Sequence, residues 1–468
     1  MLHKIPRVVI SGLKGGSGKT TLTLGILKNL KDKGLNITPF KKGPDYIDAG
    51  WLARASGRRC YNLDTFIMPE DQILTSFISQ SVNSNGSLIE GNRGLFDGVD
   101  SSGTFSTASL AKLCGAPIIL VVDCEKTTNT LGVIVKGICG FDSELSIKGV
   151  VLNYTAGARH ERIITEAIEK HAGVQVLGAI RRESASLVPE RHMGLFSSLE
   201  YSAVDVALNA IGKVIANSVD IDKIWNICNE SFPINYEITT ANNTPQHKNV
   251  VKIGIIKDSS FQFYYPENIS ALSKLGADII QISALESHEL MDVDALYIGG
   301  GFPETNAPLL AKNQSFMKSL RTNIEKGLPV YAECGGFMFL GNTIINGNKV
   351  FPMTGIFPVD FVMESKPQAH GYTIVEVCKE NTFFNKNVIL KGHEFHYSRV
   401  TGLNVKSQGI APQFTFVYKM DRGKGIADGY DGLMYKNVLA TYTHLHALGS
   451  NVWAEGMISA AMKYKSNR

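Results

Sequence analysis

A glycine-rich loop near the beginning of the chain follows a run of β-branched residues and precedes a segment with helical spacing. The run is Arg7–Gly12 (RVVISG), the loop is Leu13–Thr21 (LKGGSGKTT), and apolar residues recur at helical intervals from Leu22 to Asp32. In such a loop successive backbone N–H groups point into one concavity, and glycine lets a phosphate approach the backbone closely. The order of strand, glycine loop and helix therefore predicts a nucleotide-phosphate site on an α/β sheet.

The loop also assigns roles to individual side chains. Lys19 is placed to neutralise the β- and γ-phosphates of ATP, and the Thr20 hydroxyl is placed to bind Mg²⁺. The loop departs from the usual pattern because Leu13 occupies the position of the first glycine. The residues that we expect to bind ATP are Lys14, Gly15, Gly16, Gly18, Lys19, Thr20, Thr21 and Asn153.

Two acidic segments follow predicted strands. Lys41–Asp48 (KKGPDYID) comes after one β-rich run, and Ile89–Gly98 (IEGNRGLFDG) ends another. Ligands collect at the carboxyl ends of strands in open α/β sheets, and Mg²⁺ prefers carboxylate oxygens beside phosphate. Asp45 and Glu90 are therefore the candidate Mg²⁺ ligands together with Thr20, although a lone aspartate after a strand is more often a turn or cap residue.

The chain has 468 residues, which is long enough for two or three domains. β-Branched runs alternate with helical stretches as far as about residue 212, which favours a mostly parallel sheet with helices on both faces. A polar, turn-rich segment follows, and a second α/β series begins at Val251. We predict a P-loop domain at 1–238, a linker at 239–249 and a second α/β domain at 250–468.

Composition narrows the class of protein. The net charge is +4 and no long block of lysine and arginine occurs, so nucleic acid is not an expected partner. No apolar run approaches the roughly 18 residues of a membrane span, and the first residues lack a signal-peptide core. The seven cysteines form no CxxC pair, which is typical of free thiols in a reducing compartment. We expect a cytoplasmic enzyme that binds neither membrane nor nucleic acid.

A second chemistry appears about 300 residues downstream. The segment Tyr331–Gly336 (YAECGG) places Cys334 directly after a predicted strand, and its two glycines allow a sharp turn into a helix. In such a nucleophile elbow the side chain is lifted clear of the sheet, and the next N–H stabilises an oxyanion. Gly335 is one expected oxyanion donor, and a glycine run after another predicted strand supplies Gly300 and Gly301 as candidates for the other.

A thiol nucleophile also needs a base. His444 follows the strand-like region Gly432–Leu439 and is the candidate base, while His446 would return to the same face of a strand and is the alternative. The segment His393–His396 (HEFH) resembles a zinc-protease motif, but one residue instead of two separates its glutamate from the second histidine. Its aromatic neighbours favour a strand.

Together these motifs resemble the cobyrinic acid a,c-diamide synthase family of cobalamin biosynthesis. The resemblance implies a dethiobiotin synthetase-like, ATP-dependent amidoligase domain followed by a class I glutamine amidotransferase-like domain. It also implies a Cys–His pair without the usual acidic third member, and His446 indeed stands where that acid would be. Besides the phosphate loop, the segments that carry the resemblance are Lys42–Asp48, Glu90–Gly98, Pro189–Leu195, Gly299–Glu304, Cys334–Gly336, Gly392–Ser398 and His444.

The resemblance further implies that two side-chain carboxylates of cobyrinate, a and c, become amides with glutamine as the nitrogen source. A carboxylate is a poor electrophile, so ATP must phosphorylate it before ammonia released at Cys334 attacks it. The implied substrate-binding residues are Tyr46, Asp48 and Asp97. The cations available to a corrinoid polycarboxylate are Lys41, Arg93, Arg181, Arg182 and Arg191.

Three alternatives stay open. A related family amidates nickel-sirohydrochlorin in coenzyme F430 biosynthesis, and cobyric acid synthase amidates other corrinoid positions, although Pro44–Asp48 fits the a,c-enzyme better. The loop is also close to the deviant form of P-loop ATPases such as Mrp/MinD-like switches, in some of which the extra lysine reaches across a dimer. Lys14 thus leaves open a homodimer, whereas an ATPase switch alone would not explain Cys334 and His444.

Overall fold

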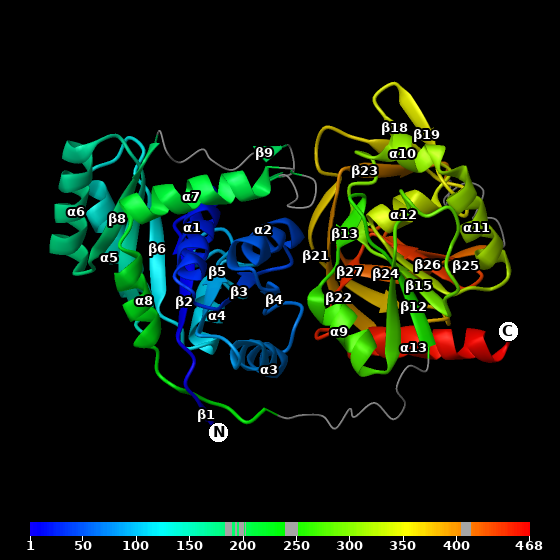
Figure 1. Ribbon diagram of the computed structural model, residues 1–468, viewed down its shortest axis with the longest axis horizontal. Coiled ribbons are helices and arrows are strands. Elements are labelled where there is room, and N and C mark those ends of the chain that lie inside the picture. The colour runs from blue at the N-terminus through cyan, green and yellow to red at the C-terminus, as the bar shows by residue number, and fades with distance from the viewer. Residues whose placement is uncertain (183–189, 192–193, 196–200, 202, 239–250, 404–412) are drawn as a thin grey trace. The chain divides into compact units, whose positions relative to one another are not determined.

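The computed structural model describes residues 1–182, 190–191, 194–195, 201, 203–238, 251–403 and 413–468. The chain divides into two compact units, Met1–Thr239 and Thr240–Arg468 (Figure 1). The linker predicted at 239–249 lies outside the described residues, and so does part of the segment Pro189–Leu195.

The first unit alternates strands with helices, as the sequence predicts. Its elements are β1 (Leu2–His3), β2 (Arg7–Gly12), α1 (Lys19–Asp32), β3 (Ile37–Lys42), α2 (Tyr46–Ser56), β4 (Tyr61–Leu63), α3 (Glu70–Ser81), β5 (Gly86–Glu90), α4 (Thr107–Leu113), β6 (Ile118–Asp123), α5 (Thr130–Phe141), β7 (Ile147–Thr155), α6 (Ala158–Ala172), β8 (Val176–Arg181), β9 (Glu190–Arg191), β10 (Gly194–Leu195), α7 (Val204–Ser218), α8 (Ile221–Asn229) and β11 (Ile234–Asn235).

A parallel sheet of seven strands forms the centre of this unit. The strand order is β4-β3-β5-β2-β6-β7-β8, and each neighbouring pair is parallel. Helices cover both faces: Val8 and Ile10 pack in one core with α1, α2, α7 and α8, while Val9 points the opposite way and is equally buried. Parallel strands end at one edge of a sheet, so the loops after β2, β3 and β5 meet there.

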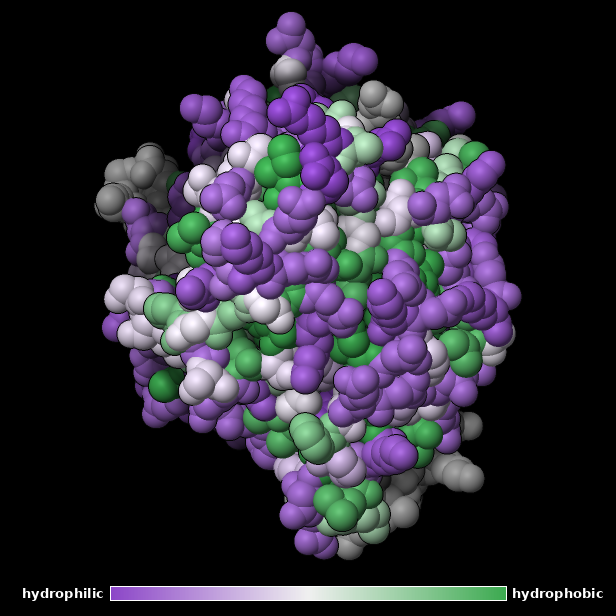
Figure 2. All heavy atoms as spheres, turned by 90° about the vertical axis from the view of Figure 1, so that its left-hand side faces the viewer, coloured by the Kyte–Doolittle hydropathy of each residue, from purple (hydrophilic) through white to green (hydrophobic). Residues whose placement is uncertain are grey.

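The helix α5 exposes three large apolar side chains. Val133, Ile134 and Phe141 are 62%, 41% and 75% exposed. On the face of the molecule that Figure 2 presents, apolar side chains are interspersed with hydrophilic ones. No helix in the described part of the chain is long and apolar enough to cross a membrane.

The second unit joins a parallel half-sheet to a larger antiparallel part. Its elements are β12 (Val251–Ile256), β13 (Phe261–Phe263), α9 (Pro266–Lys274), β14 (Ala277–Ile282), β15 (Ala295–Ile298), β16 (Gly300–Gly301), α10 (Ala307–Lys312), α11 (Gln314–Glu325), β17 (Val330–Glu333), α12 (Gly335–Leu340), β18 (Thr343–Asn346), β19 (Lys349–Pro352), β20 (Asp360–Met363), β21 (Ala369–Val377), β22 (Ile389–His396), β23 (Ser398–Thr401), β24 (Phe414–Arg422), β25 (Tyr430–Tyr435), β26 (Val438–Thr441), β27 (His444–Leu445) and α13 (Asn451–Ser466).

The main sheet of this unit has the order β14-β12-β15-β17-β26-β25-β24-β21-β22-β27. The strands from β14 to β26 are parallel, and those from β26 onward pair antiparallel. The single strand region expected at Gly432–Leu439 is two strands, β25 and β26, which turn back on each other beside Lys436 with a φ of 48°. The segment His393–His396 lies in β22, so the predicted strand is confirmed.

Candidate active sites

In the first unit, the Ser17 side chain packs against the base of the glycine loop, whereas no atom of the described residues fills the side-chain positions of the glycines at its tip. Ser17 Oγ donates to the Lys14 carbonyl over 2.7 Å, and a Cβ on Gly12 would lie 2.9 Å from that same Oγ. A Cβ on Gly15 or Gly16 would instead meet no atom within 4 Å. The backbone at the tip can therefore receive an anion at the N-terminus of α1.

Lys19 and Asn153 hold the loop from two sides. Lys19 Nζ donates to the Lys14 carbonyl over 3.0 Å, so the ammonium bends back over the loop. Burial, and then Lys41, lower the pKa of Lys19 to about 8, so a polyphosphate would stabilise its charged form. Asn153 Nδ2 donates to the Ser17 carbonyl over 2.8 Å and approaches so closely that Gly18 could carry no Cβ.

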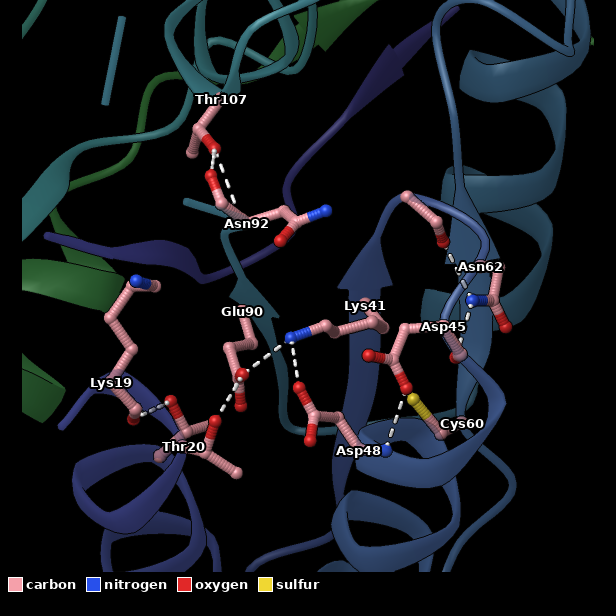
Figure 3. Close-up of polar contacts among 12 residues, drawn as sticks. Lys19, Thr20, Lys41, Asp45, Asp48, Cys60, Asn62, Glu90, Asn92 and Thr107 are labelled. Atoms are coloured by element: carbon pink, nitrogen blue, oxygen red, sulfur yellow. Dashed lines mark hydrogen bonds and ion pairs between the residues drawn. The ribbon is translucent and has the colours of Figure 1, made fainter. Parts of the chain in front are cut away.

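Glu90 is the centre of a buried group at the ends of β3 and β5 (Figure 3). Its Oε1 accepts from Thr20 Oγ1 over 2.8 Å and from Lys41 Nζ over 2.6 Å, and Lys41 also pairs with Asp48 Oδ2 at 2.6 Å. Burial raises the pKa of Glu90, against the opposing effect of Lys41. Burial lowers the pKa of Lys41, but Asp48 and Glu90 outweigh it and the net shift is upward.

The donor set around Glu90 fits Mg²⁺. Glu90 Oε2 is buried and has no hydrogen-bond partner among the described residues, and it belongs to the same carboxylate that accepts from the Thr20 hydroxyl. Mg²⁺ is commonly held by one or two carboxylates, water and the phosphate oxygens of its substrate, so three preassembled carboxylates are not required.

The other residues predicted at this edge of the sheet interact mainly with residues close to them in the sequence. Asp45 caps α2 by accepting the Asp48 N–H over 2.9 Å, and burial followed by Asp48 raises its pKa to about 7. Asp97 accepts the Gly94 N–H over 2.8 Å. Tyr46 is the first residue of α2. Metal binding by Asp45 and substrate binding by Tyr46, Asp48 and Asp97 stay predictions.

The cations of this unit are arranged differently from the sequence-based expectation. Lys41, expected beside the polycarboxylate, is 3% exposed and lies between Glu90 and Asp48. Its positive charge is therefore neutralised by these two carboxylates inside the protein. Arg182 pairs with Glu125 at 2.7 Å, and Lys14 pairs with Asp123 at 2.8 Å. Contact of Lys14 with a partner's nucleotide stays a prediction. Arg93 and Arg181 are exposed, and the side chain of Arg191 lies outside the described residues.

In the second unit Cys334 occupies the sharp turn between β17 and α12. Its φ of 47° and ψ of −97° are rare for a residue other than glycine. Its N–H donates to the Thr441 carbonyl over 2.7 Å, and its carbonyl accepts from Met338 over 3.0 Å, so neighbouring elements fix the turn. The side chain is 6% exposed, with Sγ 3.9 Å from the Phe395 carbonyl. This is the geometry of a nucleophile elbow.

His444 lies against the thiol and two other buried groups. It hydrogen-bonds to Cys334, its Nδ1 is 3.3 Å from Glu333 Oε2, and its ring stacks on His393 with centroids 4.9 Å apart. Burial alone would lower the pKa of His444, but Cys334 and Glu333 outweigh it and raise it to about 10. Burial and His444 lower the pKa of His393 well below its usual value. His444 is therefore the histidine placed to accept the thiol proton.

His446 does not share this position. β27 ends at Leu445, so the common strand face expected for His444 and His446 does not form. The Leu448 N–H donates to His446 Nδ1 over 3.2 Å, and Nε2 lies 3.6 Å from Glu267 Oε2. These contacts favour His444 over His446 as the base.

The glycines predicted for the oxyanion hole come together at the same place. A Cβ on Gly335 would lie 3.0 Å from the Gly301 nitrogen, and a Cβ on Gly300 would lie 2.6 Å from His444 Cε1. The absence of side chains thus lets the two backbone segments approach each other and leaves room for the imidazole ring. Donation from Gly300, Gly301 and Gly335 to an oxyanion stays a prediction.

Both units match known families. Residues 8–196 match the CobQ/CobB/MinD/ParA nucleotide binding domain, and residues 252–452 match the CobB/CobQ-like glutamine amidotransferase domain. Proteins named cobyrinate a,c-diamide synthase from Magnetococcus marinus and Archaeoglobus fulgidus are each 37% identical to this chain, and one from Leptospira interrogans is 35% identical. The alignments cover 97%, 98% and 98% of this chain, and 97%, 98% and 99% of the respective relatives.

The chain belongs to the cobyrinate a,c-diamide synthase family. This confirms the resemblance given by the motifs, and with it the pairing of a nucleotide-binding half with an amidotransferase half. The acid usually found two residues after the histidine is absent, as expected, but His444 has an acidic neighbour from another strand, Glu333, which the resemblance did not include. Its signal in the sequence is a charged residue that ends the otherwise apolar strand Val330–Glu333, since a buried charge needs a partner.

Proposed function

We propose that this chain is a cytoplasmic cobyrinate a,c-diamide synthase, a glutamine-hydrolysing ligase of cobalamin biosynthesis that uses ATP and Mg²⁺. The observation that carries the proposal is the presence in one chain of an open phosphate loop and a buried Cys334–His444 pair. The first suits phosphoryl transfer and the second suits amide hydrolysis through a thioester. The near full-length relatives support cobyrinate as the substrate.

In the second unit, His444 takes the thiol proton as Cys334 Sγ attacks the side-chain amide carbon of glutamine. The carbon–nitrogen bond then breaks, and His444 returns the proton to the departing ammonia. Water cleaves the resulting thioester, which gives glutamate and restores the thiol. Gly301 and Gly335 are the neighbouring backbone N–H groups proposed to stabilise the oxyanion.

In the first unit, the loop Gly15–Gly18 and Lys19 hold the triphosphate and stabilise the charge of the transferring phosphoryl group. Thr20 and Glu90 would hold Mg²⁺, which would offset the negative charge of the phosphate groups. The substrate carboxylate receives the phosphoryl group, and ammonia displaces phosphate to give the amide. Lys41 keeps Glu90 and Asp48 together during this step.

The product identifies the substrate directly. The purified chain is incubated with ATP, Mg²⁺ and glutamine, together with either cobyrinate or nickel-sirohydrochlorin, and the mass of the product is measured. We expect cobyrinate to gain two amides and nickel-sirohydrochlorin to remain unchanged. Amidation of nickel-sirohydrochlorin alone would reassign the substrate, and ATP hydrolysis without glutamine hydrolysis would favour an ATPase switch.

The two neighbouring histidines give a test of the base. His444→Ala should abolish glutamine-driven amidation and spare amidation with added ammonium, whereas His446→Ala should have a milder effect because its contacts lie elsewhere. The rate of Cys334 alkylation is measured against pH in each variant. Loss of neutral-pH reactivity in His444→Ala is expected, because a thiol without its base is mostly protonated there. If only His446→Ala loses that reactivity, His446 is the base.

A further inference from the structure

Glu333 directly precedes the nucleophile and is fully buried. We infer that Glu333 is a positioning residue that holds the His444 imidazole so that its other nitrogen faces Cys334. This inference rests on the proposed glutamine hydrolysis and adds to it a third member of the catalytic group, contributed by the residue before the nucleophile. It replaces the acid that is absent two residues after His444.

Three donors converge on the Glu333 carboxylate. His444 Nδ1 lies 3.3 Å from Oε2, Tyr297 Oη donates to the same oxygen over 2.9 Å, and the Leu445 N–H donates to Oε1 over 3.1 Å. Burial and Glu333 raise the pKa of Tyr297 well above its usual value, so the phenol keeps its proton and remains a donor. Both carboxylate oxygens are thus fixed before His444 is considered.

The backbone fixes the same geometry. β17 and β26 are parallel neighbours in which Glu333 pairs with Thr441, three residues before His444. Asn268 holds the chain just beyond His444, because its Nδ2 donates to the Leu445 carbonyl over 2.9 Å and its Oδ1 accepts the Ala447 N–H over 2.7 Å. The distance between the carboxylate and the ring is therefore set by the sheet and not by a mobile loop.

This contact selects one tautomer of His444. A carboxylate accepts hydrogen bonds, so the nitrogen that faces Glu333, Nδ1, carries a hydrogen. The lone pair of the neutral ring is then on Nε2, which is the nitrogen left for the thiol of Cys334. Without the carboxylate the ring could carry its hydrogen on Nε2 and lose its ability to accept the thiol proton. An amide in place of a carboxylate acts on tautomer choice in this way in serine proteases.

A second buried pair in the same unit offers a matched control. Glu267 is 5% exposed and its Oε2 lies 3.6 Å from Nε2 of His446, so it also places a carboxylate against a buried histidine. Among the contacts described, Glu267 has none with Cys334. Glu267→Gln therefore makes the same chemical change on a histidine that we do not assign to catalysis.

The experiment compares the full-length wild type with Glu333→Gln and Glu267→Gln. In Glu333→Gln we expect kcat for glutamine hydrolysis to fall about 10²-fold or more with a small change in KM; in serine proteases the change of the triad acid to its amide lowers kcat ~10⁴-fold. The rate of Cys334 alkylation by iodoacetamide at pH 7 should fall with it, and its rise with pH should move to higher pH. Glu267→Gln should retain the wild-type profile.

A combined variant separates positioning from a merely structural role. If Glu333 acts through His444, then Glu333→Gln should cause no further loss of alkylation rate when His444→Ala is already present. A further loss, or an unchanged alkylation profile in Glu333→Gln, would overturn the inference. Should Glu333→Gln not fold, Glu333→Asp keeps a carboxylate one methylene shorter, and wild-type kcat in that folded variant would equally overturn it. A wild type that hydrolyses no glutamine would refute the proposed function itself.

Discussion

Cys334→Ala is expected to abolish glutamine-dependent amidation while leaving ammonium-dependent amidation close to that of the wild type. The variant loses only the source of ammonia, because the nucleophile and its base belong to the second unit and the phosphate loop belongs to the first. The fall in glutamine-driven turnover should reach ~10⁴-fold or more, since removal of a covalent nucleophile has effects of this size. The measurement is diamide formation from cobyrinate with each nitrogen source.

The matched control for this variant is Cys378→Ala, which removes a partly buried thiol from the same unit and should leave both activities unchanged. Failure of ammonium to restore turnover in folded Cys334→Ala would contradict the division of labour between the two units. Loss of activity in Cys378→Ala would show that the thiol effect is not specific to the elbow.

Much of the fold could be predicted from local patterns. The strand Arg7–Gly12 has the predicted bounds, and the helical spacing from Leu22 to Asp32 lies within α1, because apolar runs and helical periodicity are properties of short windows. The antiparallel part of the second unit was not predicted. Strand direction and pairing depend on partners far along the chain, so Gly432–Leu439 gave no local sign that it forms two strands of a hairpin.

The candidate sites divide in the same way. Cys334, Lys19 and the glycines have a signature in consecutive residues, and the structure shows the sharp turn at Cys334 and the bend of Lys19 over the glycine loop. Glu333 could not be paired with His444 in advance, because 111 residues separate them and only the adjacency of β17 and β26 brings them together. For His446 the sequence predicted a strand face shared with His444, and this face does not form. Side chains alternate between two faces only within a strand, and this strand ends at Leu445.

Lys41 shows why charge alone was a poor guide to substrate contacts. A lysine after a strand was expected to meet a polyanionic tetrapyrrole, but its neighbours in space are Glu90 and Asp48. A buried cation is retained only where carboxylates compensate for its lost hydration, and the sequence does not say which charges will meet. Lys41 instead pairs with two carboxylates that we propose for the phosphoryl-transfer site.

Lys19→Ala and Glu90→Gln are expected to lose amidation with either nitrogen source, which is the reverse of the pattern expected for Cys334→Ala. Lys19 bends over the phosphate loop, and Glu90 joins the Thr20 hydroxyl at the proposed Mg²⁺ site, so both variants impair activation of the carboxylate before ammonia is needed. Each loss should be at least ~10²-fold, the usual effect of removing one preorganised electrostatic contact.

Two controls accompany these variants. Glutamine hydrolysis at Cys334 should survive in both of them. Lys28→Ala, toward the C-terminal end of the same helix α1, should behave like the wild type. Near-normal ammonium-dependent turnover in Lys19→Ala would remove the phosphate loop from the reaction.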